Sequence, residues 1–153
     1  MTTLHLMVGL PGSGKTTYAK KLEQETGAIR LTPDEWHLML FGDDFPGEDH
    51  DARHSRVERV MWSVAERALT LGVDVILDFG FWSREERSAL RQQARRLGAD
   101  FRIHYMDVPF DELLRRIDLR NERAGSDPVF RISRADMESW IPFFQPPSKD
   151  ELS

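Results

Sequence analysis

Short apolar runs alternate along the chain with longer segments whose apolar residues recur at every third or fourth position. The runs are bounded by turn-forming residues and predict four β-strands, at 3–8, 28–32, 73–78 and 101–106. The longest periodic segment, 53–71, predicts a helix with one buried face. We expect that face to consist of Val57, Val60, Met61, Val64, Ala68 and Leu71.

Further helices are expected in the gaps between the strands. Ser83 and Glu86 have the spacing of a capping box, and Gly98 is a typical residue just beyond a helix end. The predicted helices cover 14–26, 84–97, 109–124 and a segment from Ser133 to Pro142 or to Pro146 and Pro147.

This alternation of strands and helices predicts an α/β fold. Strands that carry few polar residues are typical of a parallel sheet covered by helices on both faces. We therefore expect three layers and a mostly parallel sheet of about four to five strands, in a single domain over 1–153. Ligands of such sheets bind at the carboxyl ends of the strands, so functional residues are expected in 9–17, 32–36 and 78–82.

The stretch GLPGSGKTT, 9–17, directly follows the first predicted strand and has the pattern G-x-x-x-x-G-K-[ST] of a phosphate-binding loop. Its glycines allow backbone N–H groups to turn toward an anion, and the next helix presents its positive end. Lys15 is expected to reach the β- and γ-phosphates of ATP, and the Thr16 hydroxyl to ligate Mg²⁺. The alternative is a glycine-rich turn that binds nothing. The expected nucleotide contacts are Gly12, Ser13, Gly14, Lys15, Thr16 and Thr17, the last of which is equally well explained as a helix residue.

Two acidic residues follow predicted strands at the same edge of the sheet. Asp34 is interpreted as the general base that accepts the proton of an attacking hydroxyl, although a carboxylate in the first turn of a helix is the alternative. Asp78, which we expect to end the third strand, is interpreted as a carboxylate that faces Mg²⁺ through water, or else as a simple turn residue. Phe79, Phe81 and Trp82 either form a wall of the acceptor pocket or pack against a helix.

Arginines are concentrated between 115 and 134. Arg116, Arg120 and Arg123 lie at spacings of four and three and share one helix face. A break at 125–128 then predicts a flap that carries Arg131, so we expect an arginine-rich lid over about 120–135. Arg116, Arg120 and Arg131 are expected to contact the nucleotide, and Arg120 and Arg123 to stabilise the transferring phosphoryl group. For each arginine, a solvated basic face is the alternative.

The remaining charged residues are assigned to the surface or to structural roles. The acidic segment 41–56 is interpreted as a solvated loop, with binding of a cationic acceptor as the alternative. Within it, His50 and His54 have no third ligand at a convincing metal spacing. His5 and His104 lie in predicted strands and are expected to be structural. The arginines without a link to the site are Arg87, Arg91, Arg95 and Arg96, which we expect on the surface.

Composition narrows the class of protein. The chain has 153 residues, no cysteine and a formal net charge of −5. The absence of cysteine excludes disulfides and thiolate zinc sites. We expect neither a signal peptide nor a membrane span, and therefore a cytoplasmic protein. Sequence-independent binding to nucleic acid requires a basic surface, so the negative net charge argues against a nucleic-acid partner.

Five features extend over nearly the whole chain: GLPGSGKTT, LTPDEW, VILDFGFWSREER, the arginine-rich helix and FFQPPSKDE. In these the chain resembles the small P-loop kinases often labelled AAA-family ATPases, relatives of polynucleotide 5′-kinase, chloramphenicol phosphotransferase and zeta-toxin kinases. The resemblance implies ATP-dependent phosphorylation of a hydroxyl, with matching roles for Lys15, Asp34 and arginines among 116–131. Such kinases continue into another strand after the lid. The sheet here is expected to lack a fifth strand or to receive it from another segment.

The leading hypothesis is a phosphotransferase that moves the γ-phosphoryl group of Mg-ATP to a hydroxyl of a small-molecule acceptor. Two alternatives remain open. One is a nucleotide-binding ATPase or switch that transfers phosphate to water and needs no base at Asp34. The other is a polynucleotide or nucleoside 5′-kinase, which the acidic net charge disfavours.

Overall fold

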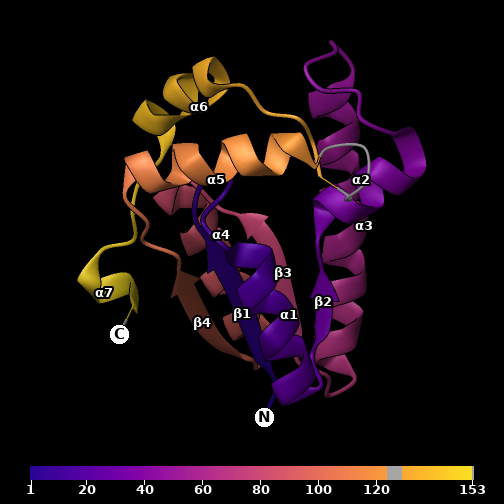
Figure 1. The fold of residues 1–153 in the computed structure, drawn as a ribbon. Helices are drawn as coiled ribbons and strands as arrows, with labels where there is room; N and C mark the ends of the chain where they lie inside the picture. Colours follow the sequence, from indigo (N-terminus) through magenta and orange to yellow (C-terminus); the bar gives the residue numbers. More distant parts are fainter. Residues whose placement is uncertain (124–128, 153) are drawn as a thin grey trace.

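Four parallel strands form a single sheet in the computed structural model, which describes residues 1–123 and 129–152. The strand order is β2-β3-β1-β4, so the first strand lies inside the sheet and β2 and β4 form its edges (Figure 1). The strands are β1 (Thr3–Val8), β2 (Ile29–Leu31), β3 (Val75–Gly80) and β4 (Asp100–Tyr105). All four predicted strands are present, but β3 lies two residues later than expected. Asp78 is therefore inside β3 rather than its last residue.

Helices occupy the gaps between the strands, as the periodicity predicted. Ser83 caps its helix by accepting a hydrogen bond from the N–H of Glu86, and Ser133 forms a capping box with Asp136. The helices are α1 (Lys15–Thr26), α2 (Pro33–Phe41), α3 (His50–Thr70), α4 (Arg84–Arg96), α5 (Phe110–Glu122), α6 (Arg134–Trp140), the 3-10 helix η1 (Ile141–Phe143) and α7 (Lys149–Leu152). No helix among these described residues is long and apolar enough to cross a bilayer.

Helices cover both faces of the sheet, and the strands bury side chains on each face. Leu4, Leu6 and Val8 of β1 point toward the core formed with α3 and α4, whereas Met7 packs with Ala19 of α1 on the opposite face. The three-layer α/β arrangement is thus confirmed. A third apolar cluster joins α5 and α6 beyond the carboxyl ends of the strands, and α5 lies across that end of the sheet (Figure 1).

The buried face of α3 differs from the one that the spacing predicted. Val60, Val64 and Leu71 are exposed, by 55%, 39% and 62%. These three residues lie along one edge of the apolar stripe of α3. The stripe is wider than the contact between α3 and the sheet, so this edge remains exposed. The buried residues of α3 are Val57, Met61, Ala65, Ala68 and Leu69.

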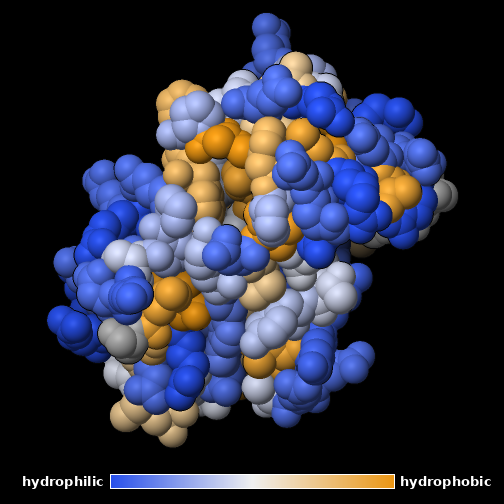
Figure 2. All heavy atoms as spheres, turned by 60° about the vertical axis from the view of Figure 1, so that its left-hand side comes forward, coloured by the Kyte–Doolittle hydropathy of each residue, from blue (hydrophilic) through white to orange (hydrophobic). Residues whose placement is uncertain are grey.

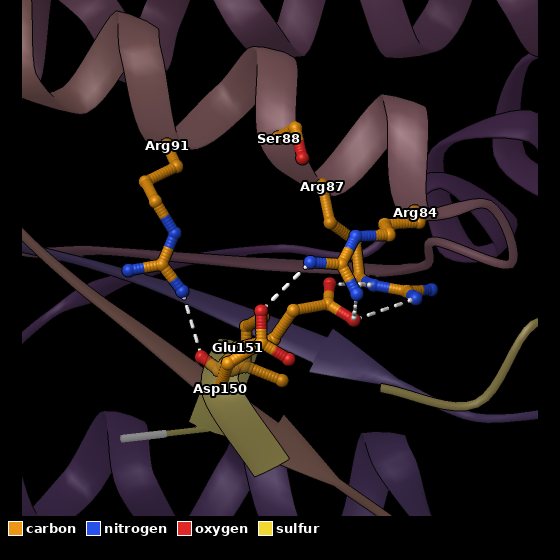
Figure 3. Close-up of a pocket in the computed structure, with 7 residues that line it drawn as sticks. Arg84, Arg87, Ser88, Arg91, Asp150 and Glu151 are labelled. Carbon is orange, nitrogen blue, oxygen red and sulfur yellow. Dashed lines mark hydrogen bonds and ion pairs between the residues drawn. The ribbon is translucent and has the colours of Figure 1, made fainter. Parts of the chain in front are cut away.

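The C-terminal helix α7 packs beside β4 and is held by arginines of α4 (Figure 3). The side chain of Arg87 is only 1% exposed, and its Nε donates to Glu151 Oε1 over 2.8 Å. Arg91 Nη2 donates to the carbonyl of the same glutamate over 2.7 Å. A cavity of about 290 Å³ lies between these residues and Ile103. The expectation that Arg87 lies on the surface is therefore wrong, and Arg91 is half-buried. Their shared partner, Glu151, is far from them in the sequence.

Along the described residues the sheet has four strands, and α7 rather than a fifth strand lies beside β4. Arg95 and Arg96 are exposed, as expected. From the side of α6 and α7, the surface is mostly hydrophilic, with hydrophobic residues in separate groups (Figure 2).

Replacement of Arg87 by leucine is expected to lower the free energy of unfolding by about 3 kcal/mol, because the carboxylate of Glu151 then stays buried without its main partner. Urea unfolding measures this difference, and Arg95→Leu on the exposed face of the same helix is the matched control, with an effect within about 0.5 kcal/mol. Hydrogen bonding to Arg87 lowers the pKa of Glu151 from its ordinary value of 4.5. The stability that the pair contributes is therefore complete above that value and is lost as the pH falls below it, so the two proteins converge in acid. Equal stability at neutral pH would contradict the assignment.

Candidate active site

The phosphate-binding loop connects β1 to α1 at the carboxyl end of the sheet. Gly12 and Gly14 have positive φ values of 85° and 90°, a conformation that residues with a Cβ rarely adopt. A Cβ on Gly12 would also lie 3.3 Å from the side chain of Ile117 in α5. The loop is fixed to the neighbouring strand by a 3.1 Å hydrogen bond from the Gly9 N–H to the carbonyl of Gly80. Backbone N–H groups at the start of α1 are thereby held in the arrangement that binds anions.

Lys15 begins α1 and folds back over its own loop. Its Nζ donates to the carbonyl of Leu10 over 3.4 Å, a long hydrogen bond that a phosphate oxygen could replace. Burial lowers the pKa of Lys15, and the carboxylates of Asp78 and Asp34 act in the opposite direction. A bound anion would add to the effect of these carboxylates and favour the charged ammonium group.

Asp78 is buried in β3 and accepts two hydroxyl hydrogen bonds on the same oxygen. Thr16 Oγ1 donates to its Oδ2 over 2.7 Å, and Thr32 Oγ1 donates over 3.0 Å. Its Oδ1 is buried without a hydrogen-bond partner among the described residues. Burial raises the pKa of Asp78, while Lys15 and the two hydroxyls lower it. An unpaired buried carboxylate oxygen beside a threonine hydroxyl is an oxygen-rich environment that suits Mg²⁺, so the residues fit that ion.

Asp34 lies in the first turn of α2, two residues after Thr32, and its side chain remains 45% exposed. Its Oδ2 is 3.9 Å from Arg120 Nη2 of α5, and its Oδ1 is 3.7 Å from His54 Nε2 of α3. Arg120 is largely buried, and its Nε has no hydrogen-bond partner among the described residues. The structure thus brings together an accessible carboxylate and a buried guanidinium group close to the phosphate loop.

The other predicted lid arginines have different positions. Arg116 Nη1 donates to the carbonyl of Gly12 over 3.3 Å, so this side chain contacts the phosphate loop directly. Arg123 is exposed and directly follows α5. Arg131 is exposed, and its backbone N–H donates to Asp43 Oδ2 over 3.3 Å. The middle of the predicted lid, 124–128, lies outside the described residues.

The aromatic residues after Asp78 pack against other parts of the protein. Phe79 and Phe81 stack with ring centroids 5.1 Å apart, and Trp82 contacts Trp140 near the end of α6 at 5.7 Å. Phe81 has a φ of 41°, the one positive value for a residue other than glycine among those described. Packing is therefore the better of the two predicted roles for Phe81 and Trp82.

A buried histidine cluster beside Asp34 was not predicted. His37 of α2 is fully buried, and its Nδ1 is 3.1 Å from His54 Nδ1. Asp44 Oδ1 is 2.7 Å from His37 Nε2 and 2.6 Å from His50 Nδ1, so Asp44 and His50 do not belong to a solvated loop. The spacing of His50 and His54 was visible in the sequence, but the third histidine precedes them by thirteen residues or more.

The cluster has donor atoms at a spacing that could hold a metal ion. The ligating atoms of His37, Asp44 and His50 lie within 4.8 Å of one another. However, Arg53 Nη1 also donates to Asp44 Oδ2 over 3.1 Å, and both imidazoles lie at hydrogen-bond distance from Oδ1. The carboxylate is already satisfied by three donors, so we interpret the cluster as a hydrogen-bond network.

Glu58, one turn after His54 on α3, was also missed. Burial, together with the nearby carboxylates of Glu86 and Asp34, raises the pKa of Glu58 to about 7. The side chain therefore changes charge near neutral pH on the α3 side of Asp34. By contrast, His5 and His104 form a 2.9 Å pair between β1 and β4, in agreement with a structural role.

The chain is similar to a probable kinase and to a chain of an RNA repair complex. A probable adenylyl-sulfate kinase of Aeropyrum pernix is 27% identical over 114 residues, which cover 72% of this chain and 61% of that protein. A chain in the structure of the Pnkp1/Rnl/Hen1 RNA repair complex is 25% identical with a TM-score of 0.74, over 93% of this chain and 43% of that one. This chain therefore spans less than two thirds of the length of either relative.

The fold also matches that of the Mycobacterium tuberculosis adenylyl-sulfate (APS) kinase CysC, solved with AMPPNP and APS. The TM-score is 0.62 at 20% identity, over 97% of this chain and 84% of that one. The fold is thus that of a P-loop kinase. The sequence profile of the AAA_33 family, described as an AAA domain, matches residues 4–147, and the chain belongs to this family.

Proposed function

We propose that this protein is an ATP-dependent phosphotransferase that moves the γ-phosphoryl group of Mg-ATP to a hydroxyl of a small-molecule acceptor. We further propose that residues 1–153 act as one kinase domain. The observation that carries the proposal is the position of Asp34, an accessible carboxylate 3.9 Å from a buried arginine at the edge of the sheet where the phosphate loop lies. An enzyme that only hydrolyses nucleotide does not need such a group, whereas transfer to an alcohol does.

In this proposal the phosphate loop binds the triphosphate. Backbone N–H groups of Gly12, Ser13 and Gly14 surround the phosphates, and Lys15 moves from the carbonyl of Leu10 to the β- and γ-phosphates. The nucleotide-bound APS kinase of the same fold supports ATP as the ligand. Thr17, exposed in the first turn of α1, is the proposed contact of the α-phosphate.

The proposed magnesium ligands are the Thr16 hydroxyl and, through water, Asp78. The unpaired Oδ1 of Asp78 supports this assignment because it is a buried acceptor without a donor among the described residues. The ion, when bound, neutralises part of the charge of the triphosphate.

The proposed role of the arginines is to stabilise charge on the transferring group. Arg120 is the best supported, because it is buried next to Asp34 and is already partly desolvated. Arg116 contacts the loop and is assigned to the nucleotide. Arg123 and Arg131 are proposed to join the site from the lid side, the first at the phosphoryl group and the second at the nucleotide.

In the proposed reaction the acceptor oxygen forms a bond to the γ-phosphorus as the bond to the β-phosphate oxygen breaks. ADP leaves with that oxygen, and the proton of the acceptor hydroxyl passes to the Asp34 carboxylate. Asp34 suits this step because it is exposed enough to reach an acceptor and held near Arg120 and Lys15. The base is expected to contribute a factor of about 10²–10⁴ to the rate.

A polynucleotide 5′-end is a second candidate acceptor. It is favoured by the likeness to a chain in an RNA repair complex at 25% identity. The net charge of −5 weakens it, because binding along a phosphate backbone gains its affinity from positive side chains. The acceptor panel described next separates the two candidates.

Replacement of Asp34 by alanine is expected to reduce phosphoryl transfer at least about 100-fold while ATP affinity changes little, because the base acts on the acceptor and not on the nucleotide. The measurement is transfer of labelled γ-phosphate to sugars, aminoglycosides, nucleosides and 5′-hydroxyl oligonucleotides. Asp111→Asn is the matched control, an exposed acid in the first turn of α5. Equal acceptor-dependent transfer by Asp34→Ala would refute the role of this residue, and hydrolysis without any phosphorylated acceptor would favour an ATPase.

Replacement of Lys15 by alanine is expected to weaken Mg-ATP binding about 30-fold, which corresponds to the loss of about 2 kcal/mol from a charge-assisted hydrogen bond. Asp78→Asn is expected to reduce the gain in ATP affinity that Mg²⁺ provides. Titration calorimetry with and without Mg²⁺ measures both effects. Lys21→Ala, at an exposed position on the same helix, is the control that should bind as the parent does. Undiminished binding by Lys15→Ala would show that the loop is not the nucleotide site.

A further inference from the structure

Four side chains form a continuous line from the segment after α2 to the proposed base. Asp44 contacts His37, His37 contacts His54, and His54 faces Asp34, at 2.7, 3.1 and 3.7 Å. His37 is fully buried, whereas the side chain of His54 is 23% exposed. The line therefore passes through the protein interior at His37 and ends at the group that proton transfer would use.

The charge of Asp44 sets the direction of the hydrogen bonds. Partial burial acts to raise the pKa of Asp44, but hydrogen bonds from His50, Arg53 and His37 hold it well below its ordinary value. Asp44 is consequently an ionised carboxylate that can only accept. His37 Nε2 must then carry a proton and donate it to Asp44.

For a neutral His37, this assignment determines the protons along the rest of the line. A neutral imidazole has one N–H, so a His37 that donates from Nε2 has a lone pair on Nδ1. The 3.1 Å contact between the two Nδ1 atoms needs one proton, which His54 Nδ1 must supply. His54 Nε2 therefore presents a lone pair toward Asp34, so the site holds a proton acceptor directly behind the proposed base.

We propose that His54 receives the proton that Asp34 takes from the acceptor hydroxyl, an inference that rests on the phosphotransferase function proposed above. The O–H bond of the acceptor breaks and the proton passes to Asp34. Once the 3.7 Å separation closes to hydrogen-bond distance, the O–H bond of Asp34 breaks and the proton bonds to Nε2 of His54. Asp34 returns to a carboxylate and His54 becomes an imidazolium ion beside it. His54 acts through Asp34 and is a positioning residue, with its tautomer set by His37 and Asp44.

The surroundings of His54 keep it ready to accept a proton. Burial lowers the pKa of His54, Asp34 acts to raise it, and His37 and His50 lower it further. The neutral form of His54 is therefore present at neutral pH. A charged Asp34 stabilises the imidazolium form. The charged and titratable groups that face this pair are Lys15 from α1, His37 from α2, His50, Asp51 and Glu58 from α3, Asp78 from β3 and Arg120 from α5.

The first test does not depend on kinase activity. Nitrogen-15 NMR of the histidine side chains in the full chain reports which ring nitrogen carries the proton. We expect His54 at pH 8 to be protonated at Nδ1, and Asp34→Asn to lower its pKa because a neighbouring negative charge is removed. An Nε2-protonated His54, or a pKa that Asp34→Asn leaves unchanged, would overturn the proposal.

The second test is kinetic. His54→Gln is expected to lower kcat about tenfold with little change in the KM for ATP, and to remove the rise of kcat with pH that reflects loss of the His54 proton. His104→Gln, in the structural histidine pair, should keep the parental rate and profile. Glu58→Gln should keep the rise of kcat with pH. This control shows that the rise does not come from the titration of Glu58. If the pH profile of kcat is the same in His54→Gln as in the parent, the proposed role of His54 is refuted, but the phosphotransferase function is not. Absence of transfer by the parent to every acceptor would instead refute the phosphotransferase.

Discussion

The geometry of the site depends on the hydrogen bonds that the buried carboxylate of Asp78 accepts. One of its oxygens accepts hydrogen bonds from Thr16 at the start of α1 and from Thr32 at the end of β2. Because Asp34 follows Thr32 by two residues, the same carboxylate sets the distance between the phosphate loop and the proposed base. A polar group so deeply buried is tolerated because both hydroxyls and Lys15 compensate for lost hydration.

The site is assembled from two sides of the molecule. The proposed nucleotide side consists of the loop, α1 and Arg116 of α5. The proposed acceptor side consists of α2 and α3 with their acidic and histidine side chains. Asp34 and Arg120 are the residues through which the two sides meet. The proposed acceptor side contains Glu58, whose pKa is raised to about 7 by burial and nearby carboxylates, so the charge of this side depends on pH near neutrality.

Local patterns in the sequence predicted most of the fold and the phosphate loop. Strand runs, caps and the glycine–lysine–threonine motif depend on neighbours within a few residues, and these were found where expected. Contacts between residues far apart in sequence were not predictable in the same way. Arg87 seemed a surface residue because Glu151 is 64 positions away, and His37 seemed unremarkable because its partners are on another helix and a loop. The exposed edge of α3 was misassigned for a related reason, since periodicity indicates an apolar stripe but not how wide its neighbour is.

Phe81 connects the C-terminal helix to the active-site side of the sheet. Its φ of 41° is costly for a phenylalanine, and its carbonyl accepts a 2.9 Å hydrogen bond from Arg87, the residue that pairs with Glu151. The last turn of the described chain therefore braces a strained bend that directly follows the strand of Asp78. Because Arg87 contacts both the Phe81 carbonyl and Glu151, a displacement of α7 would change the support of that bend.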